Sequence, residues 1–258
     1  MPVDVITDLA FLGFFAFLAG YIDSVAGGGG LIQVPALLVG LQNESVATLF
    51  GTNKFSSVFG TLNATIKYAT KVALPWKYLG VGTFFAFVFS LAGAGIVSAL
   101  SKDLVRPVVL VLLICVVLYT VFRPNFGLHS GTILSGRKSL VLATISGALM
   151  GFYDGFFGPG TGTFLIVIFI GVFGLNFLQA SACSKIINLV TNIGALCYFL
   201  PNGNVLFTTG ICMAACNMTG AYFGARAALK HGSGFVRKFF IGISSILIIK
   251  IAIDTFMN

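Results

Sequence analysis

Charged residues are scarce in this sequence: only 9% of the 258 residues are Asp, Glu, Lys or Arg, while 57% are hydrophobic. A soluble domain of this length needs neither so little charge nor so much apolar surface. The apolar residues gather in long runs, and one of them, LVRPVVLVLLICVVLYTVF (104–122), is long enough to cross the hydrocarbon core of a bilayer. The composition therefore predicts an all-α polytopic membrane protein.

Residues that bind metals or form redox centres are also few. The chain has two histidines, and its five cysteines lie in apolar segments without a CxxC pair. We therefore expect no metal and no cofactor. Basic residues are missing before the first apolar stretch, so a cleaved signal peptide is not predicted. We ascribe the net charge of +8 to cytoplasmic loops and expect no nucleic-acid partner.

The sequence matches itself when it is shifted by 131 residues. The shift places Lys54 on Lys185, and it places the glycine break DSVAGGGG (23–30) on DGFFGPGT (154–161). No gap is needed along the match. It predicts a duplication, with a first repeat at 1–122, a linker at 123–138 and a second repeat at 139–258. In transporters, such repeats often locate the binding site.

Each repeat contains five apolar segments, of which the first two are short. A spanning helix needs roughly 20 residues, so we interpret each short pair as a broken re-entrant hairpin with the glycine break at its tip. Three transmembrane helices then follow in each repeat. The segments lie near 9–22, 31–41, 44–68, 77–100 and 104–122, and near 139–153, 164–175, 177–199, 206–229 and 236–256.

The basic residues indicate how the two repeats are oriented. If each repeat crosses the membrane three times, the two repeats are inverted relative to each other. One face of the membrane then carries loops 67–77, 123–138 and 226–238 with ten basic residues, and the opposite face carries two basic residues. An even number of crossings would divide the same residues six against six. The positive-inside rule favours two inverted repeats in the cell (inner) membrane, a cytoplasmic linker and both termini outside the cytoplasm.

The glycine breaks suggest an anion site. Non-helical backbone at membrane depth must be buried in protein or line a polar cavity. The half-helix after each break directs its unsatisfied N–H groups and its positive dipole end into that break, where an anion can bind. The alternative is that the glycines only allow helices to pack closely.

Lysines within apolar sequence point to the same region. Lys54 and Lys185 are costly in a membrane unless they face a cavity or a partner. Polar residues follow each at helical spacing, so that one face of each helix is polar: Ser57 and Thr61 after Lys54, and Asn188 and Asn192 after Lys185. Two inverted repeats would bring these faces together around an anion.

The aspartates of the breaks leave two interpretations open. Asp23 and Asp154 could form ion pairs with the lysines and fix the hairpins without any ligand. They could instead carry protons that couple to transport, which suits a buried carboxylate with a raised pKa and does not suit a salt-bridged one.

The motifs resemble those of the TauE/SafE family of sulfite and sulfonate exporters over almost the whole chain. The resemblance rests on GYIDSVAGGGGLIQVPALLVG with GTNKFSSVFGT, and on GFYDGFFGPGTGTFLIVIFI with ACSKIINLVTNIGAL. It implies a transporter of small, often sulfur-containing anions. The sequence departs from internal symmetry at Cys183-Ser184, where the first repeat has Thr52-Asn53, so the two half-sites differ chemically.

We therefore expect a secondary transporter that moves sulfur oxyanions or organosulfonates by alternating access. The sequence leaves open whether this transport is coupled to protons. An anion channel is the main alternative. An intramembrane aspartyl protease is disfavoured because that chemistry does not call for two buried lysines. Partners are the anion and the bilayer, and the oligomeric state is left open. The predicted binding residues are Lys54, Lys185, Gly27, Gly28, Gly29, Gly30, Gly158, Gly160, Thr161, Gly162, Thr52, Asn53, Ser57, Thr61, Ser184, Asn188 and Asn192.

Overall fold

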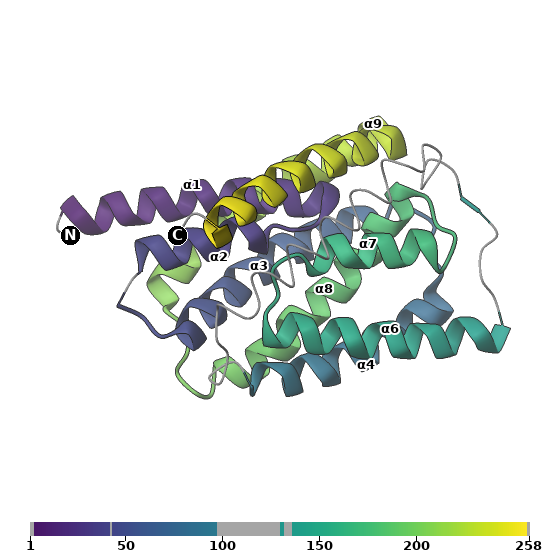
Figure 1. Ribbon diagram of the computed structural model, residues 1–258, viewed down its shortest axis with the longest axis horizontal. Coiled ribbons are helices and arrows are strands. Elements are labelled where there is room, and N and C mark those ends of the chain that lie inside the picture. The colour runs from purple at the N-terminus through teal and green to yellow at the C-terminus, as the bar shows by residue number, and fades with distance from the viewer. Residues whose placement is uncertain (1–2, 42, 97–129, 132–135, 257–258) are drawn as a thin grey trace.

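The computed structural model describes residues 3–41, 43–96, 130–131 and 136–256. Within these ranges the chain forms eight helices and no strand, as an all-α protein should (Figure 1). The expected segment 104–122 and most of the linker 123–138 lie outside the described residues. The helices are α1 Val3–Ala26, α2 Gly30–Gly40, α3 Val46–Ala69, α4 Trp76–Ala94, α6 Gly136–Phe156, α7 Thr161–Gly171, α8 Phe177–Phe199 and α9 Phe207–Phe256.

The helices before and after each glycine break differ in length. α2 and α7 have 11 residues each, about 16 Å of helix, and this confirms that the second segments are short. The first segments are longer than predicted, with 24 residues in α1 and 21 in α6. The prediction was wrong at both ends, because it began each segment too late and ended each near its aspartate. Both aspartates have ion-pair partners, so the helices continue to the glycines.

Four described helices are long and apolar enough to cross a membrane: α1, α4, α6 and α8. α8 is the most enclosed of them, with 72% of its span buried, compared with 39–44% for the other three. The outer helices expose large apolar side chains such as Phe14, Phe84 and Leu149, as surfaces in contact with lipid do. The core of the bundle is therefore centred on α8.

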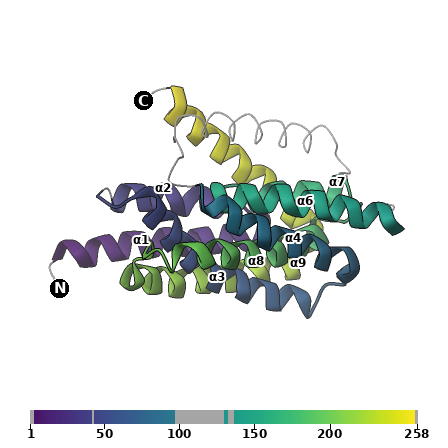
Figure 2. The same ribbon diagram turned by 90° about the horizontal axis from the view of Figure 1, so that it is seen from below.

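α9 contains two of the expected segments in a single run of 50 residues. Its backbone is not helical at Gly232, where φ is 72° and ψ is −168°, and the helix bends there. The expected segments 206–229 and 236–256 lie on either side of this bend. In Figure 2 the part of α9 near the C-terminus, drawn in yellow, leaves the bundle at an angle.

Helices of the two predicted repeats exchange neighbours across the bundle. α1 packs along α9 of the second repeat, and α6 packs along α4 of the first (Figure 1). Both contacts depend on small residues: a Cβ atom at Gly220 would overlap the carbonyl oxygen of Phe17, and one at Gly151 would overlap that of Ala86. Such close approach is typical of helix pairs in membranes.

The long helices run in two opposite directions. Contacts advance together along α1 and α9, from Gly13 beside Cys216 to Gly224 beside Ser24, so these helices are parallel. α3 runs the same way. α8 runs in the opposite direction to α3: Phe199, at the end of α8, lies beside Gly51 near the start of α3.

Candidate functional site

The two glycine breaks meet in the middle of the bundle. Gly27 and Gly28 have φ values of 75° and 86°, and Gly158 and Gly160 have 89° and 88°, in a region that residues with a Cβ atom rarely adopt. A side chain at Gly27 would also overlap the backbone of Gly162 in the other break. The glycines are therefore needed both for the turns and for the contact between them.

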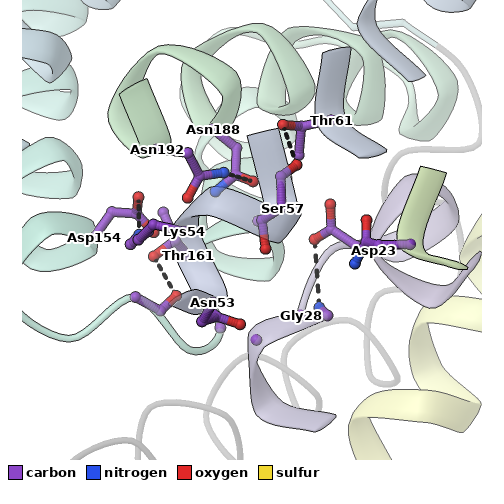
Figure 3. A pocket seen from close by; sticks show the side chains of 16 residues that line it. Asp23, Gly28, Asn53, Lys54, Ser57, Thr61, Asp154, Thr161, Asn188 and Asn192 are labelled. Atoms are coloured by element: carbon purple, nitrogen blue, oxygen red, sulfur yellow. Dashed lines mark hydrogen bonds and ion pairs between the residues drawn. The ribbon is translucent and has the colours of Figure 1, made fainter. Parts of the chain in front are cut away.

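A small cavity lies between the breaks and the polar faces of α3 and α8 (Figure 3). Its volume is about 30 Å³, which is enough space for about two water molecules. Every residue that lines it is polar or glycine, and all but Asn217 belong to the predicted set. They are Asp23, Gly28, Gly29, Gly30, Asn53, Lys54, Ser57, Thr61, Asp154, Gly158, Gly160, Thr161, Gly162, Asn188, Asn192 and Asn217.

Two ion pairs cross between the predicted repeats at this cavity. Lys54 Nζ of α3 lies 2.6 Å from Asp154 Oδ2 of α6, and Lys185 Nζ of α8 lies 2.7 Å from Asp23 Oδ2 of α1. Of the interpretations left open by the sequence, the structure thus shows the lysine–aspartate pairing, with each lysine bound to the aspartate of the other repeat. The Lys54–Asp154 pair is shielded from solvent, which strengthens its attraction, whereas Asp23 of the other pair is partly exposed.

The two pairs differ in how they face the cavity. Lys54 and Asp154 both line it, with side chains that are 4% and 2% exposed. Lys185 is fully buried and does not line it, whereas its partner Asp23 does and is 18% exposed. Asp23 Oδ1 also accepts a hydrogen bond from the backbone N–H of Gly29 (3.3 Å). The cavity therefore presents one lysine and two carboxylates.

The polar faces of α3 and α8 form two walls of the cavity. On α8, Asn192 Nδ2 donates to Asn188 Oδ1 (3.3 Å). On α3, the Thr61 hydroxyl donates to the carbonyl oxygen of Ser57 (2.7 Å). All four side chains line the cavity (Figure 3).

Both half-helices begin at the cavity without a side-chain cap. The N-cap residues of α2 and α7 are Gly29 and Gly160, which have no side chain to accept a hydrogen bond from the N–H groups of the first turn. Other helices of the bundle are capped: Ser45 Oγ accepts from the N–H of Thr48, and Asn176 forms a capping box at α8. The positive ends of α2 and α7 thus face the same small space.

Four predicted binding residues do not line the cavity: Gly27, Thr52, Ser184 and Lys185. The Ser184 hydroxyl donates to the carbonyl oxygen of Gly162 (3.0 Å), and Thr52 Oγ1 accepts from the N–H of Leu206 (3.0 Å). These side chains connect the elements that surround the cavity.

Asn217 of α9 lines the cavity and was missed by the sequence analysis. Its Nδ2 donates to Oε1 of the buried Gln33 in α2 (2.8 Å). The signal was present, because an amide inside the apolar run GICMAACNMTGAYFG is a polar group at membrane depth. In the part of the chain that the structure describes, no group of His, Cys, Asp and Glu residues could hold a metal ion.

Comparison with known proteins gives one consistent result. Residues 12–251 match the family described as Sulfite exporter TauE/SafE. The chain is 34% identical to "Probable membrane transporter protein YfcA" of Escherichia coli (strain K12), over 96% of this chain and 90% of that one. It is 35% identical to "Probable membrane transporter protein ORF9" of Sinorhizobium sp, over 95% and 93%. No solved structure matches. The chain therefore belongs to the TauE/SafE family and is a multi-pass membrane transporter, not an enzyme.

Proposed function

We propose that the chain is a secondary transporter that moves small anions of the sulfur oxyanion or organosulfonate class across the cell membrane by alternating access. The observation that carries this proposal is the cavity lined by polar residues and glycines, where Lys54 and the starts of α2 and α7, which lack side-chain caps, converge. Positive charge and backbone N–H groups are what an oxyanion needs in place of water. The family description supplies the sulfur-containing substrate class.

The proposal includes two inverted repeats as the moving parts. Its support is the opposite direction of equivalent helices: α3 and α8 occupy matching places in the two repeats and run antiparallel. The exchanged contacts of α1 with α9 and of α6 with α4 relate the repeats in the same way. A pseudo-two-fold arrangement of this kind places a substrate site at the interface of the repeats.

Charge balance favours proton coupling. The two lysines and two aspartates of the ion pairs sum to zero, so an anion adds an uncompensated negative charge to a site of low dielectric. Because an ion-paired carboxylate does not suit proton uptake, the anion first displaces one carboxylate from its lysine in this proposal, and that carboxylate then takes up a proton, which restores neutrality. We propose Asp23 and Asp154 as the groups that take up this proton.

We further propose that the linker faces the cytoplasm and that both termini lie outside it. In support, residues of the expected basic loops meet at one end of the bundle. Ser130 lies within hydrogen-bond distance of Asn176, which accepts a hydrogen bond from Ser233. Lys67 and Arg226 line one hollow at the same end. The positive-inside rule assigns such an end to the cytoplasm of the inner membrane.

The test measures thermal stabilisation of the purified protein by sulfite, thiosulfate, a short alkylsulfonate and acetate. A ligand that binds the folded state raises the unfolding temperature with its concentration. The key variant is Lys54→Gln/Asp154→Asn, which removes both charges and keeps two hydrogen-bonding side chains of similar size. Lys77→Gln, at an exposed position at the start of α4, is the control.

We expect sulfur oxyanions to stabilise the wild type and the control, and to have no effect on the double variant. An unchanged shift in the double variant would refute the assignment of the site. In proteoliposomes, uptake should saturate and increase with a proton gradient. Passive conductance without saturation would indicate a channel instead.

A further inference from the structure

A second hollow lies at the end of the bundle where α3 ends, well separated along α3 from the cavity of the ion pairs. Its volume is about 590 Å³. Four of its lining residues are basic, two are leucines and none is acidic. They are Lys67, Thr70 and Lys71 from α3 and the following turn, Leu178 from α8, and Arg226, Leu229 and Lys230 from α9.

The four basic residues form two matched pairs. Arg226 and Lys230 are four residues apart on one side of α9, while Lys67 lies in the last turn of α3 and Lys71 in the turn that follows it. α3 and α9 are in contact along their length, and their basic pairs flank one space. Like charges at this spacing repel each other. The arrangement is therefore destabilising unless something negative lies between the pairs.

The described chain offers no carboxylate to neutralise these charges. Within residues 3–41, 43–96 and 136–256, the two ion pairs are those of the central cavity, and neither includes a residue of this hollow. Lys67 Nζ donates instead to the carbonyl oxygen of Tyr222 (3.1 Å) and lies 2.9 Å from the centre of its ring. As far as the described residues go, the hollow thus keeps its positive charge.

Apolar surface adjoins the basic residues. Leu178 and Leu229 line the hollow itself, and Ile66 and Phe223 are exposed beside Lys67 and Tyr222 in sequence. A free inorganic anion would use only the basic groups. A phospholipid uses both kinds of surface, because its phosphate needs cations and its acyl chains need apolar side chains.

We propose that this hollow binds the phosphate headgroup of an anionic phospholipid such as phosphatidylglycerol. The lipid phosphate lies among the four cations, and the acyl chains extend along the adjoining apolar surface. Because the lining residues come from α3, α8 and α9, the bound lipid connects helices of both repeats at this end. The proposal does not depend on the identity of the transported anion.

The test titrates purified protein in detergent with phosphatidylglycerol, phosphatidylcholine or inorganic phosphate and records the unfolding temperature. The variant is Lys71→Gln/Lys230→Gln, which removes one exposed charge from the turn after α3 and one from α9. The control is Lys77→Gln/Lys238→Gln, which removes two exposed charges outside the hollow. Each charge near a membrane surface contributes about fivefold to binding, so the variant should need roughly thirtyfold more lipid for the same shift.

We expect phosphatidylglycerol to stabilise the wild type and the control at similar concentrations. The proposal is overturned if phosphatidylglycerol gives no shift, if phosphatidylcholine gives the same shift, or if the variant responds as the wild type does. An equal loss of response in the control would also overturn it, since general charge would then be responsible. An equal shift with inorganic phosphate would assign the hollow to a free anion instead.

Discussion

The two ion pairs should differ in what they contribute to stability, because their aspartates differ in exposure. Lys54→Met leaves the carboxylate of Asp154, 2% exposed, without its cation. Breaking a buried pair in this way costs about 3–5 kcal/mol. Lys185→Met leaves Asp23, which is 18% exposed and keeps the hydrogen bond from Gly29. Water reaches this carboxylate, so we expect a smaller cost of about 1–2 kcal/mol.

The assay is thermal unfolding of the purified variants in detergent, without ligand. For a chain of this length 1 kcal/mol corresponds to about 2–4 °C, so Lys54→Met should lower the unfolding temperature by roughly 6–20 °C. Lys185→Met should lower it by roughly 2–8 °C. Lys77→Met at the surface is the control and should change it by less than about 2 °C.

The reverse substitutions sharpen the comparison. Asp23→Asn leaves Lys185, which is fully buried, so this variant should lose more stability than Lys185→Met does. An apolar replacement of both members of the central pair, Lys54→Met/Asp154→Leu, should recover most of the loss, because no unpaired charge remains. A loss in Lys185→Met that equals or exceeds that in Lys54→Met would refute the reasoning from exposure.

Two further predictions concern how the cavity is held together. Gly27→Ala should destabilise the protein by about 2–4 kcal/mol, because Gly27 has a left-handed backbone and a side chain there would overlap the other break. The control Gly136→Ala has the same φ of 75° but open space around it, so it should lose only the backbone part of about 1–2 kcal/mol. Equal losses in thermal unfolding would contradict the close contact between the breaks. Tyr68→Phe removes the hydroxyl that donates to the carbonyl oxygen of Ser24 (2.8 Å), and it should lower the free energy of unfolding by about 1–2 kcal/mol. An unchanged free energy of unfolding would mean that water replaces this hydroxyl.

Hydropathy and composition were sufficient to predict the helical class and most helix positions. Segment 177–199 matches α8 at both ends, because its apolar run and its polar neighbours change sharply there. The ends of α1 and α6 were not predictable in this way. Hydropathy treats Asp23 and Asp154 as interruptions, and only their three-dimensional partners explain why the helices continue. Local composition carries no information on a contact between residues 162 positions apart.

Most of the cavity lining was predictable because the sequence matches itself at a fixed shift. The 131-residue match brought the breaks, the lysines and the polar faces together as equivalents. The same symmetry gave Lys185 the role of Lys54, whereas in the structure Lys185 is fully buried, pairs with Asp23 and does not line the cavity. Asn217 had no polar equivalent in the first repeat, where the shifted position is Ala86, and a search for matched pairs passed over it.

The exchange of neighbours between repeats changes which parts of the chain can shift as units. α1, α3 and α9 form one group of parallel, contacting helices, and α4, α6 and α8 form the other, so each group mixes both sequence repeats. The boundary between the two groups follows α3 and α8. Both ion pairs cross this boundary: Lys54 pairs with Asp154, and Lys185 pairs with Asp23. Because both pairs cross this boundary, moving one group relative to the other would have to break or rearrange both of them.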